Sequence, residues 1–380
     1  MLSKLWAITA QPAHASKTNF FSIDMLRGFA AISILVYHFR NLASAGGSLS
    51  RPPEIINQIS LLNYLRPIRE NGSLAVMLFW TISGFVFMNV YAGTRPAART
   101  FWVNRFARLY PLHFITLIII AILQIWSLRL LGHWLIYRDN DLAHFIPQLF
   151  FASAWLSSEV RSFNGPIWSV SVEILVYGIF YLFVRYAPVN MRTTVAGLLA
   201  AVVAATAYKA QVLVCATFFF GGMTAYLLFQ LWPQAHRIAL LILSAGAFLC
   251  LSLVGLKFGA HFHLPMTLWL LPIFCTAILA VATSELTLLT SFYSKIRVVG
   301  DITYSTYLWH RPLQMMFLLG AGLGWWRVEI AFNNLFFVSY LLFVCAFAYL
   351  SFRCIERPAQ RWIRAKAAGK TRDIPLIAAP

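Results

Sequence analysis

Charged residues are scarce in this sequence, and acidic residues are the scarcest of them. Only 11% of the 380 residues are charged, and just 12 are Asp or Glu. Soluble domains carry about 25% charged residues, so the chain lacks the polar surface of a water-soluble globule or a disordered protein. Its five cysteines form no CxxC pair and lie in or beside apolar stretches. They are typical of packing residues, which excludes a disulfide scaffold.

Apolar residues are abundant instead. They make up 60% of the chain, and the mean hydropathy is +0.72. One crossing needs about 20 apolar residues, so we expect an all-α polytopic membrane protein with about ten transmembrane helices. The predicted spans are about 24–43, 73–92, 110–131, 167–186, 193–209, 211–231, 238–257, 265–284, 299–321 and 329–354. Residues 144–156 are apolar but short and contain Pro147, so a re-entrant or interfacial segment is an alternative to a further span there.

The basic residues indicate the topology. Lys and Arg exceed Asp and Glu by 18, and they lie mostly between apolar runs, which favours contact with anionic lipid and not with nucleic acid. Ten spans place both termini on the cytoplasmic side, where basic residues concentrate. We therefore expect a cytoplasmic segment at 1–22 without a cleavable signal, a transmembrane domain at 23–355 and a basic cytoplasmic tail at 356–380.

The first span, IDMLRGFAAISILVYHF, carries two ionisable residues eleven positions apart, Arg27 and His38. That spacing places them on one helix face, about 16 Å apart along the axis. Ionisable groups at membrane depth are costly and tend to face a cavity or a partner. The alternative is that Arg27 reaches the interface beside Asp24 while His38 only packs.

The fourth span, beginning GPIWSVSVEILVYGIFYLF, carries Glu173 at a depth similar to that of His38. A carboxylate beside an imidazole can orient the ring and stabilise its cation, as a general base requires. The alternative is a carboxylate that only bonds to another helix for packing.

Two further segments carry candidate binding residues. The predicted loop NRFARLYPLHF places Arg105 and Arg108 at the mouth of the third span, where guanidinium groups can clamp a phosphate. A similar cluster follows from topology alone. In the second span, FWTISGFVF contains Ser83 and Gly84, which permit close helix approach.

Late in the chain, GDITYSTYLWHRP gathers aromatic and polar residues, among them Tyr307 and His310, and is typical of a cavity wall.

His261 and His263 lack a carboxylate to complete a metal site, so we expect no metal. The sequence contains no G-x-S-x-G elbow, Walker A loop or Rossmann fingerprint.

Six blocks together resemble one family. IDMLRGFAAISILVYHF, FWTISGFVF, RFARLYPLHF, GPIWSVSVEILVYGIFYL, GDITYSTYLWHRPL and IERPAQRW, in that order, are similar to the type-3 integral-membrane acyltransferases. The resemblance implies transfer of an acyl group, commonly acetyl, from cytoplasmic acyl-CoA to a hydroxyl of a cell-envelope carbohydrate or glycolipid at the inner membrane. It maps the family's functional positions onto Arg27, His38, Arg105, Arg108 and Glu173. Some members carry an appended hydrolase-like domain, and we expect the stand-alone form here.

These observations combine into a mechanistic hypothesis. Acyl-CoA, a substrate and not a permanently bound cofactor, would dock through Arg105, Arg108 and Arg27. His38 would act as general base or transient acyl carrier, with Glu173 holding its ring. The side chains expected to contact substrate are Ser83, Trp168, Tyr307 and His310. Two alternatives remain at this point: a transporter or flippase of acyl or glycan intermediates, and a different class of membrane acyltransferase with its catalytic histidine late in the chain.

Overall fold

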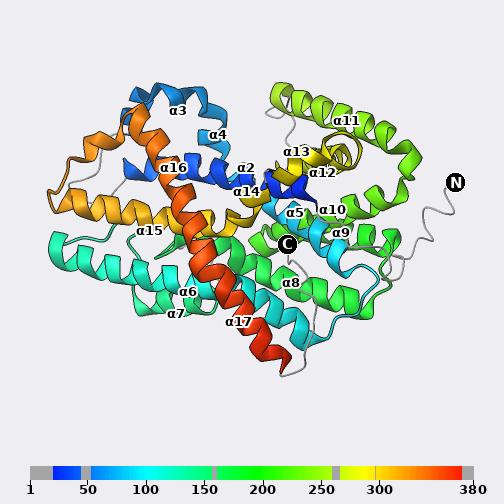
Figure 1. Cartoon of the computed structure of the whole chain (residues 1–380), viewed down its shortest axis with the longest axis horizontal. Coiled ribbons are helices and arrows are strands. Elements are labelled where there is room, and N and C mark those ends of the chain that lie inside the picture. Colours follow the sequence, from blue (N-terminus) through cyan, green and yellow to red (C-terminus); the bar gives the residue numbers. More distant parts are fainter. Residues whose placement is uncertain (1–19, 44–52, 156–160, 259–265, 296, 370–380) are drawn as a thin grey trace.

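The computed structural model describes residues 20–43, 53–155, 161–258, 266–295 and 297–369, and every named element within these ranges is a helix. Figure 1 shows the helices as one bundle. Nine helical segments in the described ranges are long and apolar enough to cross a membrane. The predicted all-α polytopic membrane fold is therefore confirmed.

These segments contain the following long helices: α2 (Phe21–His38), α5 (Leu74–Tyr91), α6 (Ala98–Leu131), α8 (Trp168–Tyr186), α9 (Met191–Tyr208), α10 (Gln211–Leu231), α11 (Arg237–Phe258), α12 (Met266–Ser284) and α16 (Asn334–Ser351). Shorter pieces connect them: η1 (Phe39–Leu42), η3 (Pro53–Gln58), α3 (Ser60–Tyr64), α4 (Arg66–Asn71), α7 (Leu142–Leu149), η4 (Gly165–Ile167), η5 (Gln234–His236), η6 (Glu285–Leu289), α13 (Thr290–Lys295), α14 (Arg297–Asp301), η7 (Val328–Ala331), η8 (Phe352–Glu356) and α17 (Arg357–Ala368).

One further long helix, α15 (Thr303–Gly322), lies inside the bundle. Its 20 residues extend about 30 Å, the thickness of a bilayer core. It is more polar than the nine apolar segments and is therefore not counted among them. Most of its side chains are nevertheless buried, including His310 and Arg311. The polar residues of α15 therefore face protein and not lipid.

Helices α5 and α10 cross at very short range because glycine lies on both sides of the contact. A Cβ added at Gly84 would lie 1.8 Å from the carbonyl oxygen of Phe219, and one added at Gly222 would lie 1.8 Å from that of Thr81. Any larger residue at either position would collide with backbone. The close helix approach predicted at Ser83 and Gly84 is thus confirmed, and it fixes the helix that carries Ser83.

The predicted loop before residue 110 was wrong, and the predicted tail contains a helix. The arginine segment expected as a loop before residue 110 is helical, because α6 begins at Ala98 and continues through Pro111. The tail expected from residue 356 is helical to Ala368: α16 leads through the π-turn η8 into α17, and α17 contacts α6. Figure 1 shows α16 and α17 as one continuous rod. Of the predicted terminal segments, residues 1–19 and 370–380 lie outside the described residues.

The short apolar segment around Pro147 forms α7, which has 8 residues and is about 12 Å long, too short to cross a bilayer. It docks on α6, where a ring nitrogen of His113 lies 2.8 Å from the carbonyl oxygen of Gln148. The segment is therefore not a transmembrane helix, in agreement with the ten-span count.

Candidate functional site

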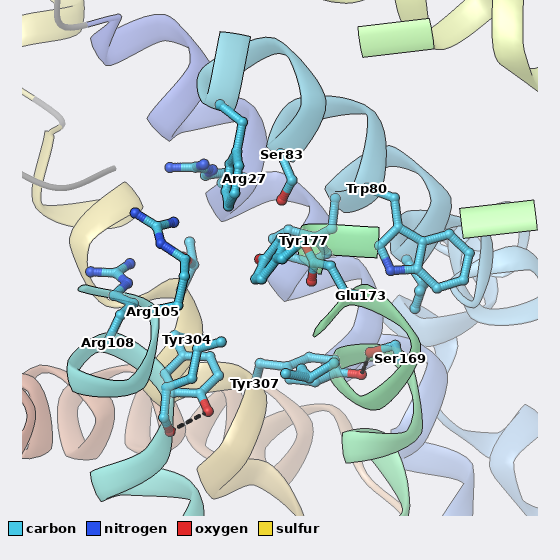
Figure 2. A pocket seen from close by; sticks show the side chains of 16 residues that line it. Arg27, Trp80, Ser83, Arg105, Arg108, Ser169, Glu173, Tyr177, Tyr304 and Tyr307 are labelled. Carbon is cyan, nitrogen blue, oxygen red and sulfur yellow. Dashed lines mark hydrogen bonds between the residues drawn. The ribbon is translucent and has the colours of Figure 1, made fainter. Parts of the chain in front are cut away.

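A cavity of about 830 Å³, including its open mouth, lies between α2, α5, α6, α8 and α15. Figure 2 shows that its polar lining comes from segments far apart in the sequence. The polar and aromatic lining residues include Arg27, Trp80, Ser83, Arg105, Arg108, Ser169, Glu173, Tyr177, Tyr304 and Tyr307. Six residues predicted from sequence therefore share one cavity: Arg27, Ser83, Arg105, Arg108, Glu173 and Tyr307.

Helix α2 is anchored where it begins. The Glu285 carboxylate accepts hydrogen bonds from the backbone N–H groups of Phe21 at 3.0 Å and Ser22 at 2.8 Å. These N–H groups have no partner within the helix, and an anion is favourable at this end of the helix dipole. The anchor positions Arg27, whose guanidinium lies 3.4 Å from Asp24. Arg27 thus faces the cavity and keeps a nearby counter-charge.

Arginine side chains lie along one side of the cavity. Arg105 is only 7% exposed, and its Nε is buried without a hydrogen-bond partner. Its guanidinium carbon lies 4.6 Å from the centre of the Phe87 ring. Arg108 lies 3.6 Å from Glu356. From α17, Arg364 brings a buried Nε and Nη2 that also have no partner, and its charge interacts with those of Arg105 and Arg108.

In this arginine cluster (Arg27, Arg105, Arg108 and Arg364), some buried N–H donors have no hydrogen-bond partner. Buried polar groups in native proteins are normally hydrogen-bonded, and orphaned ones call for an explanation. Guanidinium groups bind phosphate through paired N–H donors. An anionic group entering the cavity from this side would satisfy the open donor of Arg105, and the charge of Arg364 would add to the attraction.

Glu173 faces this cavity and not His38. Figure 2 shows its carboxylate beside Ser83 and Tyr177, and one carboxylate oxygen is buried without a hydrogen-bond partner. The nearby charges that act on it are those of Arg27 and Arg105. The contact expected between Glu173 and the His38 ring is not formed, because α8 turns the carboxylate towards the arginine cluster at that depth.

The His38 ring has other neighbours. Its Nδ1 lies 3.0 Å from Asn41 Nδ2 and 3.2 Å from Arg311 Nη2. The ring stacks on His310, with centroids 5.1 Å apart and planes inclined by 20°. We refer to His38 and His310 as the histidine pair. Two histidines separated by most of the sequence therefore meet at one point.

Arg311 holds the histidine pair in place. It is fully buried and donates to His38 Nδ1, to the Tyr137 hydroxyl at 3.0 Å and to Gln314 Oε1 at 3.2 Å. No Asp or Glu of the described residues lies within ion-pair distance of it. The sequence pattern gave Arg311 no role, although a charge beside His310 within a predicted span was a usable signal.

Helix α15 links the cavity to the histidine pair. Tyr304 and Tyr307 line the cavity, and His310 follows Tyr307 by three residues, about 4.5 Å along the axis. The Tyr307 hydroxyl donates to the carbonyl of Pro166 at 2.6 Å and lies 2.7 Å from Ser169 Oγ. Tyr307 is the last residue of α15 that lines the cavity, and His310 follows it by about one helical turn.

Trp168 lies in a second layer. Its ring packs edge-on against Trp80, with centroids 5.8 Å apart, and Trp80 lines the cavity. The predicted contact of Trp168 with substrate would therefore act through Trp80.

The sequence pattern missed two residues near the arginine cluster. Arg364 lies in what reads as a basic tail. Glu356 accepts hydrogen bonds from Ser305 and Gln360.

Within the described ranges no group of three or more His, Cys, Asp or Glu side chains could hold a metal ion. His261 and His263 lie outside the described residues. The chemistry available at this site is therefore that of the arginine cluster, the Glu173 carboxylate and the histidine pair.

Comparison with known proteins points to acyl transfer. A family model described as an acyltransferase domain (acyltransferase 3) matches residues 20–353. Acyltransferase MdmB of Streptomyces mycarofaciens is 30% identical over 188 residues, covering 48% of this chain and 44% of MdmB. O-acetyltransferase OatA of Staphylococcus aureus is 22% identical over 390 residues, covering 89% of this chain and 57% of OatA. The putative peptidoglycan O-acetyltransferase YrhL of Bacillus subtilis is 24% identical over 394 residues, covering 88% and 54%.

The chain thus spans about half the length of these curated relatives. No solved structure matches it significantly.

Proposed function

This chain belongs to the acyltransferase family whose model matches residues 20–353, and on that premise we propose that it is a membrane-embedded O-acyltransferase. It moves an acyl group, most simply acetyl, from acyl-CoA to a hydroxyl of a cell-envelope carbohydrate or glycolipid. The names of two relatives specify O-acetyl transfer, and one of them specifies peptidoglycan. The observation that carries the proposal is one cavity with an arginine cluster on one side and, about one helical turn along α15 from the lining residue Tyr307, a histidine pair.

The arginine cluster is the docking site for the donor in this proposal. Coenzyme A carries its negative charge on phosphates at one end and its thioester at the other. Phosphate oxygens would take the open donor of Arg105 and share Arg108 with Glu356, and Arg364 would contribute its charge. This side of the membrane would be the cytoplasmic one, since basic residues concentrate there, and the membrane would be the inner membrane.

The thioester would then extend past Tyr307 to the histidine pair. Arg27 and His38 lie on one face of α2, and eleven residues of helix separate them by about 16 Å. The acceptor hydroxyl would meet the acyl carbon there, and His38 would contact the reacting group directly. Glu173 takes a place on the donor side, where its charge balances Arg27 and Arg105.

The direct test uses the purified protein in lipid nanodiscs with acetyl-CoA labelled in the acetyl group. We expect release of free thiol and transfer of label to an envelope glycan fraction, and we expect His38→Gln to lose both. Mass spectrometry of cell-surface glycans with and without the protein would then identify the acetylated unit. Wild-type thiol release by His38→Gln would contradict the proposal.

A transporter or flippase of acyl or glycan intermediates would also need buried ionisable groups. The same preparation distinguishes it, because a transporter moves its cargo without breaking the thioester bond. Movement of labelled acyl-CoA or glycolipid across a vesicle membrane without thiol release would favour the transporter.

A further inference from the structure

Arg311 determines which nitrogen of His38 carries the proton. A guanidinium has only N–H donors and no acceptor, so the contact of 3.2 Å between Arg311 Nη2 and His38 Nδ1 requires a lone pair on Nδ1. The Asn41 amide nitrogen, 3.0 Å from the same atom, also donates. In a neutral imidazole the proton must then be on Nε2. His38 therefore presents an N–H group at Nε2 and not a lone pair.

His310 has the opposite arrangement. Its Nδ1 lies 2.7 Å from the carbonyl oxygen of Tyr307, and a carbonyl only accepts, so Nδ1 must carry the proton. The lone pair of a neutral His310 is therefore on Nε2. This atom is buried and has no hydrogen-bond partner. A buried acceptor without a donor is costly, and a substrate hydroxyl would provide the missing donor.

We propose that the two histidines divide the chemistry: His310 Nε2 is the general base for the acceptor hydroxyl, and the Nε2–H of His38 binds the oxyanion that forms on the acyl group. This assignment rests on the proposed acyl transfer and makes it specific. The sequence alone suggested His38 as the general base, and this assignment gives that role to His310. The stacked rings, 5.1 Å apart, are close enough for one acyl carbon and its attacking oxygen to contact both.

The step balances as follows. The hydroxyl oxygen bonds to the thioester carbon while its proton moves to His310 Nε2, and the carbonyl electron pair moves to the oxygen that accepts from His38. When this oxyanion collapses, the carbon–sulfur bond breaks, and the departing thiolate takes the proton back from His310. The products are an ester and coenzyme A with a free thiol, and both histidines return to their starting tautomers.

The charge of Arg311 acts on both histidines, but its direct contact with His38 Nδ1 favours this division over the reverse. If His38 were the base, its ring would become a cation with Nδ1–H pointing at the Arg311 guanidinium, and among the described residues no carboxylate contacts the ring to offset the repulsion. A protonated His310 keeps its Nδ1–H bond to the Tyr307 carbonyl. The charge of Arg311 then adds to the stabilisation of an oxyanion held at His38.

Nitrogen NMR tests the tautomers without any substrate. The wild-type protein, with ¹⁵N-labelled histidine and reconstituted in lipid bilayers, should show His38 protonated at Nε2 and His310 protonated at Nδ1. His38→Gln and His310→Gln assign the two signals, and exposed His236 serves as the reference for a solvated ring. In Arg311→Gln the new side chain can accept from Nδ1, so the His38 proton should move there while His310 stays unchanged. Reversed tautomers in the wild type would overturn the proposal.

Acceptor chemistry tests the catalytic roles. Hydroxylamine attacks a thioester with a neutral amine nitrogen, so it needs no general base. With acetyl-CoA and hydroxylamine, we expect His310→Gln to keep most of the wild-type rate and His38→Gln to lose about 10²–10³-fold, the usual effect of removing an oxyanion donor. With the glycan acceptor, His310→Gln should lose about 10²–10⁴-fold. Exposed His236→Gln is the control and should match the wild type in both assays.

If hydroxylamine rescues His38→Gln and not His310→Gln, the roles are reversed and the proposal is wrong. If the wild type releases no thiol with either acceptor, the proposed acyl transfer itself fails, and the catalytic roles fail with it. The tautomers measured by NMR would be unaffected by that result, so the two failures can be told apart.

Discussion

The arginine cluster and the histidine pair share helix α2 but are built in opposite ways. The arginine cluster borders an open cavity, holds carboxylates close by and leaves buried N–H donors without partners. The histidine pair is closed and stacked, its nearest charge is a guanidinium, and its open atom is an acceptor on His310. The first is suited to gather a charged group of variable position, whereas the second fixes individual protons. Mutations should therefore separate binding from turnover.

The largest expected effect is at the histidine pair. His38→Gln should lower the turnover of acetyl-CoA by about 10²–10³-fold, because one donor to the developing oxyanion is lost. Donor affinity should stay within about twofold, since the arginine cluster is intact. Thiol release gives the turnover, and calorimetry with coenzyme A gives the affinity. A parallel loss of affinity would show that the two regions act as one site.

The next effect is at Arg105. Arg105→Gln removes a buried guanidinium, and hydrogen bonds to charged groups are each worth about 1.5–3 kcal/mol. The dissociation constant for coenzyme A should therefore rise about ten- to hundredfold, with little change in turnover at saturating donor. Arg99→Gln is the matched control, because Arg99 is on the same helix but exposed. Equal binding by Arg105→Gln and the wild type would remove the arginine cluster from the donor site.

A third substitution acts on the crossing of α5 and α10. Gly84→Ala places a methyl group 1.8 Å from the backbone oxygen of Phe219, and such overpacking costs about 1–3 kcal/mol of stability. Thermal unfolding of the purified protein should shift downward, and donor binding and turnover should fall together with the folded fraction. Gly246→Ala on α11 is the control, since nothing lies within 4 Å of the added atom. An unshifted unfolding curve would mean that α5 and α10 can separate without cost.

The smallest effect is expected from α17. Arg364 is partly exposed and is not among the lining residues of the cavity, and partly solvated charge interactions are worth about 0.2–1 kcal/mol. Arg364→Gln should weaken coenzyme A binding by about two- to fivefold at low salt, and the difference should shrink as salt is added. Arg361→Gln, on the same helix but exposed, should bind as the wild type does. A salt-independent loss would instead indicate that α17 has moved.

The sequence predicts the helices well, because bilayer thickness imposes their length. The span expected at about 211–231 is α10, Gln211–Leu231. The sequence predicts less well where bilayer thickness does not impose a helix: the arginine-rich segment was expected as a loop, but α6 is already helical there. The same holds for residues 356–368, where packing on α6 maintains a helix that hydropathy does not require.

The sequence likewise predicted some features of the candidate site and missed others. Sequence spacing placed Arg27 and His38 on one helix face, and in the structure Arg27 lines the cavity while His38 has polar neighbours. It failed for the partner of His38, because matching depths in two helices fix only one coordinate and leave the direction of each side chain open. The actual neighbour, Arg311, is 273 residues away along the chain. Such a contact depends on how α2 and α15 pack, which periodicity does not encode.

The anchor at the start of α2 also has a consequence for donor choice. Two backbone N–H groups bound to Glu285 fix where the helix begins, and the helix is unbroken from Phe21 to His38. It therefore acts as a spacer of fixed length, about 16 Å between Arg27 and His38. A carrier with a short arm could bind its charged end or present its acyl carbon, but not both at once. The first property that this enzyme selects would then be the reach of the carrier, before the identity of the acyl group.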